Sequence, residues 1–376
     1  MERFAHDTGL TNALETPKRY LWTDAFAVCN FFQLAKSTGK RDYQRLALSL
    51  IDQVHAVLGR HHPDSGQQGW ISGLDDSEAA KHPTIAGLRI GKTLNERALD
   101  DAFDERREWD RDGQYFHYLT KWMHALNVAY EETRNVDFLR WAVELAHTAF
   151  ARFSYAVGPG QPKRMYWKMR VDLSEPLIPS MGQHDPLDGL LTFLELDSNR
   201  LEVENSGLTL AAEIHELERM CTDRSWATSD ALGIGGLLGD AWKYLQLRQR
   251  GHATSALNIN TLVDDMTWSL QRFLQENTLN LPATYRLAFR ELGLAIGLQA
   301  IPRISDASAA HLEYLSQQER VDRQYDFLTR ITPLHTAIEQ FWLEPGNQQV
   351  ASWHDHLDIN RVMLASSLTP ERFLTI

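Results

Sequence analysis

The stretch Leu21–Leu58, "LWTDAFAVCNFFQLAKSTGKRDYQRLALSLIDQVHAVL", decides the fold because it contains two kinds of helix in succession. Its first part, "LWTDAFAVCNFFQLA", is apolar on nearly all sides, which is typical of a buried helix. Its second part is apolar along one stripe only, which indicates a helix with one face in water. The stripe consists of Ala47, Leu50, Ile51, Val54 and Leu58. We therefore predict a hairpin of one buried and one amphipathic helix.

The same alternation continues along the chain. Further buried helices are predicted in "YFHYLTKWMHALNVAY", "ALGIGGLLGDAWKYL" and "YRLAFRELGLAIGL", and amphipathic ones in "FLRWAVELAHTAF" and "LNINTLVDDMTWSLQRFL". The glycines of "ALGIGGLLGDAW" follow no strand, so they predict close helix packing rather than a nucleotide motif. Counting segments gives roughly twelve helices in six pairs. We predict an all-α single domain over residues 1–376, in which a repeated helical hairpin closes on itself.

Two connections are much longer than the turns within the hairpins. They run from about residue 60 to 113 and from about residue 155 to 182. Loops longer than about 15 residues are uncommon in compact domains unless they carry function. An inner ring of buried helices inside an outer amphipathic ring collects these loops at the N-terminal ends of the inner helices. We expect the functional site at that face.

Composition narrows the class of protein. The chain has 376 residues and a formal net charge of −12, and 43% of its residues are hydrophobic, which suffices for a large core. The acidic balance argues against nucleic acid or an anionic membrane as the main partner. No long apolar segment marks a signal peptide or a membrane span, so we expect a cytoplasmic protein. The oligomeric state is not indicated.

Several segments carry a resemblance to a known group of proteins. They are "WTDAFAVCNFFQLAKSTGKRDYQRLA", "GWISGLDD", "HPTIAGLRIGK", "WDRDGQYFHYLTKWMHAL" and "SMGQHDPLDGL". The chain resembles the α/α-toroid proteins, and among them bacterial members of the six-hairpin glycosidase superfamily that have no assigned reaction. The resemblance implies an (α/α)6 toroid and carbohydrate chemistry. Members of the superfamily include glycoside hydrolases, and a related toroid is found in sugar epimerases and isomerases.

The stretch "MGQHDPLDGL", Met181–Leu190, contains the first catalytic candidates. Asp185 could be the N-cap of a buried helix with Pro186 at its first position, which leaves His184 and Asp188 unexplained. Asp188 lies one turn beyond Asp185, so both carboxylates can face the same side. Paired carboxylates are the acid and the base or nucleophile of glycosidic cleavage. Asp24 is the third candidate carboxylate.

A second cluster lies at the start of the next buried helix toward the N-terminus, in "EWDRDGQYFHYLTKWMHAL". His117 and Lys121 are spaced i, i+4 and share a face. A buried charge must be paired or must line a polar site. We therefore predict that His117 and His184 position the substrate or transfer protons, and that Asp112, Tyr115 and Lys121 contact the substrate.

Other residues are predicted to bind the substrate. Trp22, Trp70 and Tyr115 offer aromatic faces to a sugar ring, and Arg89 and Lys92 suit a carboxylate or phosphate. Trp353 and His356, in "SWHDHLDINRVML", complete the set. His354 and His356 are two residues apart, so a helix does not place them on one face, and we predict neither a metal site nor a cofactor.

Three functions remain open. The leading hypothesis is a glycoside hydrolase that acts on an oligosaccharide or a small molecule with aspartate acid and base groups. The first alternative is a sugar epimerase or isomerase in which histidines move a proton on a carbon next to a carbonyl. The second alternative is a carbohydrate-binding or interaction protein without catalysis, because a fold alone does not fix a function.

Overall fold

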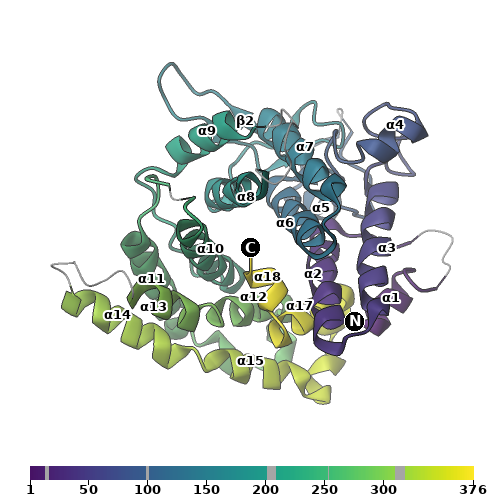
Figure 1. The fold of residues 1–376 in the computed structure, drawn as a ribbon. Coiled ribbons are helices and arrows are strands. Elements are labelled where there is room, and N and C mark those ends of the chain that lie inside the picture. Colours follow the sequence, from purple (N-terminus) through teal and green to yellow (C-terminus); the bar gives the residue numbers. More distant parts are fainter. Residues whose placement is uncertain (13–16, 99–100, 201–208, 253, 310–317) are drawn as a thin grey trace. The chain divides into compact units, whose positions relative to one another are not determined.

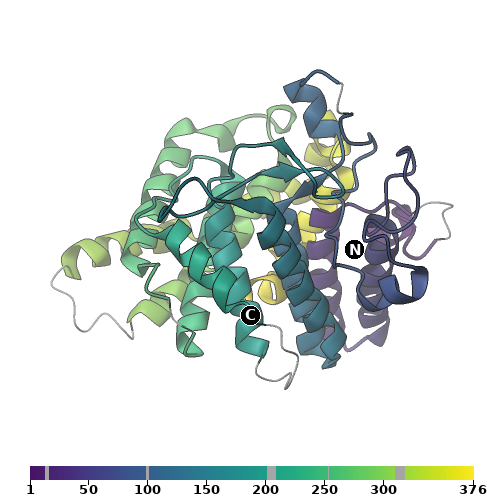
Figure 2. The same ribbon diagram turned by 90° about the horizontal axis from the view of Figure 1, so that it is seen from above.

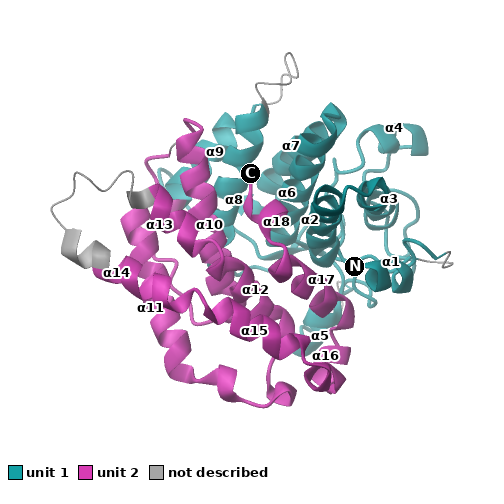
Figure 3. Cartoon of the chain, turned by 60° about the horizontal axis from the view of Figure 1, so that its bottom comes forward, with its two compact units in different colours: residues 1–220 teal, residues 221–376 magenta. Residues whose placement is uncertain are grey.

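The computed structural model describes the whole chain except residues 13–16, 99–100, 201–208, 253 and 310–317 (Figure 1). The chain divides into two compact units, Met1–Met220 and Cys221–Ile376 (Figure 3). The long loops and most predicted site residues belong to the first unit. The single domain over residues 1–376 stays a prediction.

The first unit is built mainly of helices. Its helices are α1 (Glu2–Asp7), α2 (Leu21–Thr38), α3 (Arg41–Leu58), α4 (Asp76–Lys81), α5 (Glu105–Asp110), α6 (Phe116–Thr133), α7 (Val136–Phe153), α8 (Asp185–Arg200) and α9 (Ala211–Cys221). Helix α2 packs against α6, and α6 packs against α8, so the buried helices of this unit form one layer. The amphipathic helices α3 and α7 pack on α2 and α6 with their apolar stripes buried.

One short strand follows the first long loop, and further short strands lie along the second. They are β1 (Gln114–Tyr115), β2 (Ser154–Tyr155), β3 (Arg164–Met165), β4 (Lys168–Met169) and β5 (Pro176–Ile178). Strands β1, β4 and β5 form an antiparallel sheet in that order with β4 in the middle, and β2 pairs with β3. Because β1 runs directly into α6, this sheet lies beyond the N-terminal end of that helix (Figure 2).

The second unit repeats the alternation. Its helices are α10 (Ala231–Gln249), α11 (Ile259–Glu276), α12 (Ala288–Leu298), α13 (Ile301–Ala309), α14 (Gln318–Ile331), α15 (Leu334–Leu343), α16 (Ala351–His354), α17 (Leu357–Leu368) and α18 (Glu371–Leu374), with 3₁₀ turns at Thr278–Asn280, Ala283–Tyr285 and Pro345–Gln349. Helix α12 packs between α10 and α17, while α11 packs on α10 and α15 on α12. Each unit thus alternates buried and amphipathic helices, which confirms the all-α class and the alternation of helix types predicted for an (α/α)6 toroid.

The glycines of α10 act as the sequence predicts. A Cβ atom on Gly235 would lie 2.1 Å from the carbonyl oxygen of Gly293 in α12, and one on Gly297 would lie 2.4 Å from the carbonyl oxygen of Gly235. Real Cβ atoms do not approach so closely. The two helix backbones therefore touch at a place where any side chain would force them apart.

One predicted turn is wrong. The polar run "LDSNRL", residues 196–201, predicts a turn, but α8 continues to Arg200. Its polar residues are satisfied inside the unit: the Nδ2 atom of Asn199 donates to Oδ1 of Asn127 in α6 at 2.8 Å. One turn earlier, Glu195 accepts a hydrogen bond of 2.9 Å from the amide of Asn127 and contacts Nδ1 of His124 at 2.7 Å. Polar residues that form a buried hydrogen-bond network between two helices therefore resemble a turn in the sequence.

Among the described residues, no helix is both long enough and apolar enough to cross a membrane.

Candidate active site

The N-terminal ends of three buried helices meet in the first unit. The hydroxyl of Tyr20, the residue before α2, lies 2.6 Å from the hydroxyl of Tyr118 in the first turn of α6. Nδ1 of His117 in α6 lies 3.8 Å from Oδ1 of Asp185, the first residue of α8. These contacts bring together side chains that are far apart in sequence at the face where the long loops are found. The residues gathered there, which we call the His117 cluster, are Tyr20, Tyr115, His117, Tyr118, Thr120, Lys121, Trp167, Asp185 and Asp188.

Aromatic rings surround the His117 imidazole. Trp167, which precedes β4, lies parallel to it with ring centroids 6.3 Å apart, and Tyr118 meets it edge-on at 4.8 Å. The ring of Tyr115, in β1, is 5.3 Å away. The His117 side chain remains 30% exposed, so its rim can meet a ligand. Burial among these rings lowers the pKa of His117 to about 4, because the charged imidazolium is poorly solvated there.

The Nδ1 atom of His117 is buried and has no hydrogen-bond partner within the described part of the chain. Because its pKa is about 4, the imidazole ring is neutral at neutral pH and keeps a nitrogen lone pair. A neutral imidazole is a competent proton acceptor.

Asp185 is held by the chain turn that leads into α8. Its Oδ2 atom accepts a hydrogen bond of 3.1 Å from the backbone N–H of Gly182. The first i→i+4 bond of the helix runs from the N–H of Asp188 to the carbonyl of His184 at 2.9 Å, so His184 is the N-cap and Asp185 the first helical residue. The predicted N-cap at Asp185 is therefore wrong by one position, since the carboxylate bonds backwards along the chain instead of forwards into the helix.

Burial, and to a smaller extent the negative charge of Asp188, raise the pKa of Asp185 to about 7. The Gly182 hydrogen bond and the charge of Lys121 act in the opposite direction. Asp185 is only 4% exposed, which explains why desolvation is the largest effect. A carboxyl group with such a pKa is partly protonated at neutral pH and can donate a proton.

Asp188 has a different environment although it lies one turn further along α8. Its Oδ1 atom is 2.7 Å from Nζ of Lys121, and its Oδ2 atom accepts a hydrogen bond from the hydroxyl of Thr120. Both partners come from α6. This carboxylate is thus neutralised by a cation and fixed by a hydroxyl, and the charge of Lys121, a predicted substrate contact, is paired within the protein.

Asp24 belongs to the start of α2. Its Oδ2 atom accepts a hydrogen bond of 2.9 Å from the backbone N–H of Tyr20, and its Oδ1 atom lies 3.4 Å from the guanidinium of Arg19. Both contacts stabilise the chain entering the helix. Trp22, the predicted stacking residue beside it, is 6% exposed and packs on Phe26 with ring centroids 4.5 Å apart. These contacts account for both residues without a substrate.

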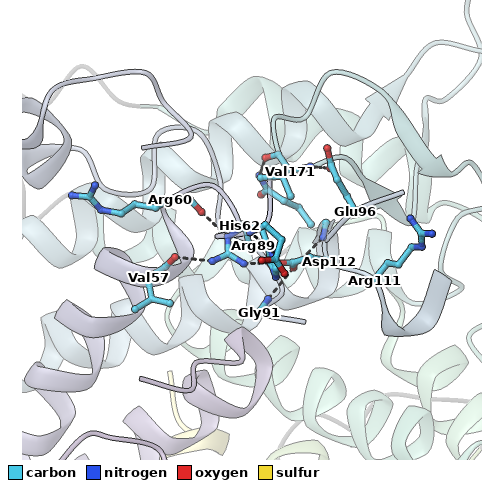
Figure 4. A network of polar contacts seen from close by, with 12 residues as sticks. Val57, Arg60, His62, Arg89, Gly91, Glu96, Arg111, Asp112 and Val171 are labelled. Atoms are coloured by element: carbon cyan, nitrogen blue, oxygen red, sulfur yellow. Dashed lines mark hydrogen bonds and ion pairs between the residues drawn. The ribbon is translucent and has the colours of Figure 1, made fainter. Parts of the chain in front are cut away.

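Arg89 and Asp112 form a buried ion pair that fastens the first long loop (Figure 4). Arg89 also donates to the backbone carbonyls of Val57 and Arg60, at 2.9 and 2.6 Å. Asp112 accepts from the backbone N–H of Gly91 at 3.0 Å. Since Arg89 is 4% exposed and Asp112 fully buried, the structure engages both residues within the protein instead of presenting them to a ligand.

Tyr115 belongs to the His117 cluster, and Lys92 lies beside it. Nζ of Lys92 stands 5.3 Å from the centroid of the Tyr20 ring. The Tyr115 hydroxyl is buried and has no hydrogen-bond partner in the described structure. Burial raises its pKa. Its phenol is therefore a neutral donor at neutral pH.

The remaining predicted residues lie elsewhere. Trp70 donates from Nε1 to Asp76 at 2.7 Å, and the guanidinium of Arg60 covers its ring at 4.4 Å. In the second unit, Trp353 is buried and stacks on Trp342, and the ring of His356 meets Phe289 edge-on at 5.3 Å. Each of these predicted substrate-binding side chains thus contacts other side chains of the protein, which are not members of the His117 cluster.

Four members of the His117 cluster were not predicted. They are Tyr20, Tyr118, Thr120 and Trp167. Trp167 stands in "KRMYWKMRVDL", where the basic residues around it are the more conspicuous feature of the sequence. The usable signal was its position in the second long loop, since an aromatic residue in a functional loop is a candidate stacking surface. Neither tyrosine hydroxyl stands out in a sequence that contains 11 tyrosines.

Within the described residues, no group of three or more His, Cys, Asp or Glu side chains is arranged to hold a metal ion. Both cysteines, Cys29 and Cys221, are buried. The His117 cluster therefore offers acid–base groups, a paired cation and aromatic faces.

Comparison with known proteins gives structural matches only. A sugar epimerase from a ruminal bacterium matches with a TM-score of 0.46 and 9% identity, over 93% of this chain and 87% of that chain. Cellobiose 2-epimerase from Bacillus thermoamylovorans B4167 matches with a TM-score of 0.44 and 10% identity, over 83% and 76% of the two chains. No protein-family model and no curated protein matches the sequence.

Proposed function

We propose that this protein is a carbohydrate-active enzyme that moves a proton on a carbon next to a sugar carbonyl, as a sugar epimerase or isomerase does. One observation carries the proposal: a neutral imidazole, His117, lies 3.8 Å from a carboxyl group, Asp185, whose pKa is about 7. The two groups form an acid–base pair in which the base is unprotonated and the acid protonated under the same mildly acidic conditions.

The state of Asp188 favours this chemistry over glycosidic cleavage. A two-carboxylate hydrolase needs a second carboxylate that is ready to act as nucleophile or base. Asp188, the carboxylate one turn from Asp185, is instead occupied by Lys121 at 2.7 Å and by Thr120. Asp24 is occupied by Arg19 and by the backbone of Tyr20. The order of the two enzyme hypotheses is therefore reversed relative to the sequence analysis.

The reaction follows from the protonation states. Asp185 donates its proton to the sugar ring oxygen and takes up the proton of the anomeric hydroxyl, so the ring opens to a carbonyl and Asp185 is again protonated and donates a hydrogen bond to the carbonyl oxygen. His117 takes the proton from the neighbouring carbon, the electron pair of the broken C–H bond forms a C=C bond, and the Asp185 proton passes to the carbonyl oxygen, which gives an enediol. Returning the proton to the opposite face of the same carbon gives an epimer, whereas returning it to the former carbonyl carbon gives an isomer.

His184 is a candidate for the second proton-transfer group. It is the N-cap of α8 and directly precedes Asp185, so their Cα atoms are about 3.8 Å apart. Its side chain is half-buried. A second imidazole beside the first would allow proton removal and return on different faces of one carbon.

The aromatic members of the cluster suit a sugar. Trp167 and Tyr115 present ring faces beside His117, and such faces pack against the C–H groups of a pyranose. The buried hydroxyl of Tyr115 is a donor for a sugar oxygen. The two structural matches, whose descriptions name sugar epimerases, agree with this choice of substrate class.

The proposal is tested by incubating the full chain with a panel of reducing mono- and disaccharides in heavy water and following the products by NMR. We expect deuterium at the carbon next to the carbonyl and a second sugar of the same composition. Release of a monosaccharide from a glycoside without deuterium uptake would restore the hydrolase hypothesis. Binding of a sugar with neither change would support the non-catalytic alternative.

A further inference from the structure

We propose that Lys92 is the specificity-determining residue of this site and that the substrate is an acidic sugar whose carboxylate or phosphate binds the lysine ammonium group. The inference rests on the proposed function for the identity of the site, and adds the charge of its substrate. Its basis is the position of Lys92 at the end of a chain of contacts that leads to His117.

The backbone around Lys92 is fixed against the helix ends that form the site. The carbonyl of Ile90 accepts from the N–H of Leu21, the first residue of α2, at 3.0 Å, and the N–H of Ile90 donates to Gly113 at 2.8 Å. Gly91 has φ +93°, and a Cβ atom there would lie 2.2 Å from the carbonyl oxygen of Arg19. Only glycine permits this approach, so Lys92 emerges at a defined point beside α2.

From this point the side chain reaches the aromatic part of the cluster. Nζ of Lys92 lies 5.3 Å from the ring centroid of Tyr20. The Tyr20 hydroxyl is 2.6 Å from that of Tyr118, and the Tyr118 ring is 4.8 Å from the imidazole of His117. Two tyrosines thus connect the ammonium group to the catalytic candidate. A sugar bound at His117 and Asp185 would direct its remaining carbons toward these aromatic side chains.

Lys92 differs from the other cations around the cluster because no residue described by the structure forms an ion pair with it. Lys121 pairs with Asp188, Arg89 with Asp112 and Lys168 with Glu108. Among the described residues, no carboxylate oxygen lies within 4.0 Å of the Lys92 ammonium group. The negative charges of Asp110 and Asp112 act on it from a greater distance and raise its pKa. Burial lowers the pKa by a larger amount. An incompletely solvated ammonium group without a counter-ion gains most from an anionic ligand.

The experiment measures binding and deuterium exchange on the same samples of full chain. The probes are glucuronate, galacturonate and glucose 6-phosphate, each compared with the neutral glucose or galactose. The variants are Lys92→Gln, which removes the charge, and Lys92→Arg, which keeps it. Lys36→Gln, on an exposed position of α2, is the matched control. Thermal unfolding of each variant establishes that it is folded.

We expect at least one acidic sugar to bind wild type at least ten-fold more tightly than its neutral counterpart. Lys92→Gln should abolish that preference, while Lys92→Arg and Lys36→Gln should retain most of it. A uronate preference identifies a carboxylate ligand, and a glucose 6-phosphate preference identifies a phosphate ligand. Neutral sugars that bind as well as acidic ones, no binding by any probe, or a preference that survives in Lys92→Gln would each overturn the inference.

The two proposals fail in different ways. Deuterium exchange on neutral sugars alone contradicts the role of Lys92 and leaves the acid–base function standing. A charge preference that depends on Lys92, without any exchange, supports the anion site and contradicts the proposed reaction.

Discussion

The Nδ1 atom of His117 lies 3.8 Å from Oδ1 of Asp185, and each residue stands in the first turn of a buried helix of the first unit. Burial acts on the two groups in opposite directions, because it disfavours the charged form of each. It lowers the pKa of the imidazole to about 4 and raises that of the carboxyl to about 7. The ordinary order of the two pKa values is thereby reversed, and the neutral base and the neutral acid coexist.

The reversed order predicts a bell-shaped pH dependence of kcat/KM. Activity rises as His117 loses its proton near pH 4 and falls as Asp185 loses its proton near pH 7, so the optimum lies at mildly acidic pH. Initial rates of deuterium exchange between pH 3.5 and 9 provide the measurement. An activity that increases steadily up to pH 9 would mean that Asp185 acts in its ionised form.

Two substitutions in the Lys121–Asp188 pair should shift the alkaline limb of that profile in opposite directions. Asp188→Asn removes a negative charge that raises the pKa of Asp185, so the limb moves to lower pH. Lys121→Met removes a positive charge that lowers it, so the limb moves to higher pH. Each shift is expected to be about one pH unit or less. Shifts of the same sign in both variants would show that the pair does not act through charge.

Asp185→Asn should stabilise the folded protein at neutral and alkaline pH. The folded-state pKa, about 7, is above the ordinary value of 3.8, so the contribution of Asp185 to stability is full below pH 4 and lost as the pH rises to 7. The amide cannot ionise and escapes this loss. We expect a gain of about 2 to 4 kcal/mol at pH 8, reduced by any weakening of the Gly182 contact.

The measurement is urea unfolding of wild type and variant at pH 4.5 and pH 8. The difference between the two proteins isolates Asp185 from His117, whose titration is common to both. A variant that is equally or more destabilised at pH 8 than at pH 4.5 would contradict the raised pKa.

Arg89→Met should destabilise the protein strongly. It leaves Asp112 fully buried without its cation, and removal of one partner of a buried ion pair costs about 3 to 5 kcal/mol. Arg89→Lys should restore only part of the loss, because an ammonium group does not reproduce the separate contacts to Asp112, Val57 and Arg60. Denaturant unfolding measures both variants. A change below 1 kcal/mol in Arg89→Met would mean that Arg89 does not fasten the loop.

The helical class and the alternation of helix types were predictable because apolar periodicity reports directly which faces are buried. The first hairpin shows this clearly: all five residues of the predicted stripe of α3, from Ala47 to Leu58, are at most 1% exposed. The extent of α8 was not predictable. Asn199 looks like a turn residue until its hydrogen-bond partner in α6 is known.

The sequence predicts where in the fold the candidate site lies, but it does not predict the role of each residue there. Long loops and charged residues on buried helices indicated the N-terminal ends of α6 and α8, where His117, Lys121, Asp185 and Asp188 come together. The same criteria also selected Arg89, Asp112 and Asp24, which the structure engages in ion pairs and helix-end contacts. A sequence does not distinguish a carboxylate that is paired with an arginine from one that is available for chemistry. The pairing arginine can be distant along the chain, or it can be one of several arginines that the sequence offers.

The central claim is tested most directly by the exchange of solvent deuterium into the carbon next to the sugar carbonyl, compared between wild type and His117→Gln. His354→Gln, an exposed histidine of the second unit, is the control. The account predicts that His117→Gln, with its melting temperature within a few degrees of wild type, loses exchange by about 10²- to 10⁴-fold, while the control keeps it. Exchange at the wild-type rate in folded His117→Gln would contradict the account.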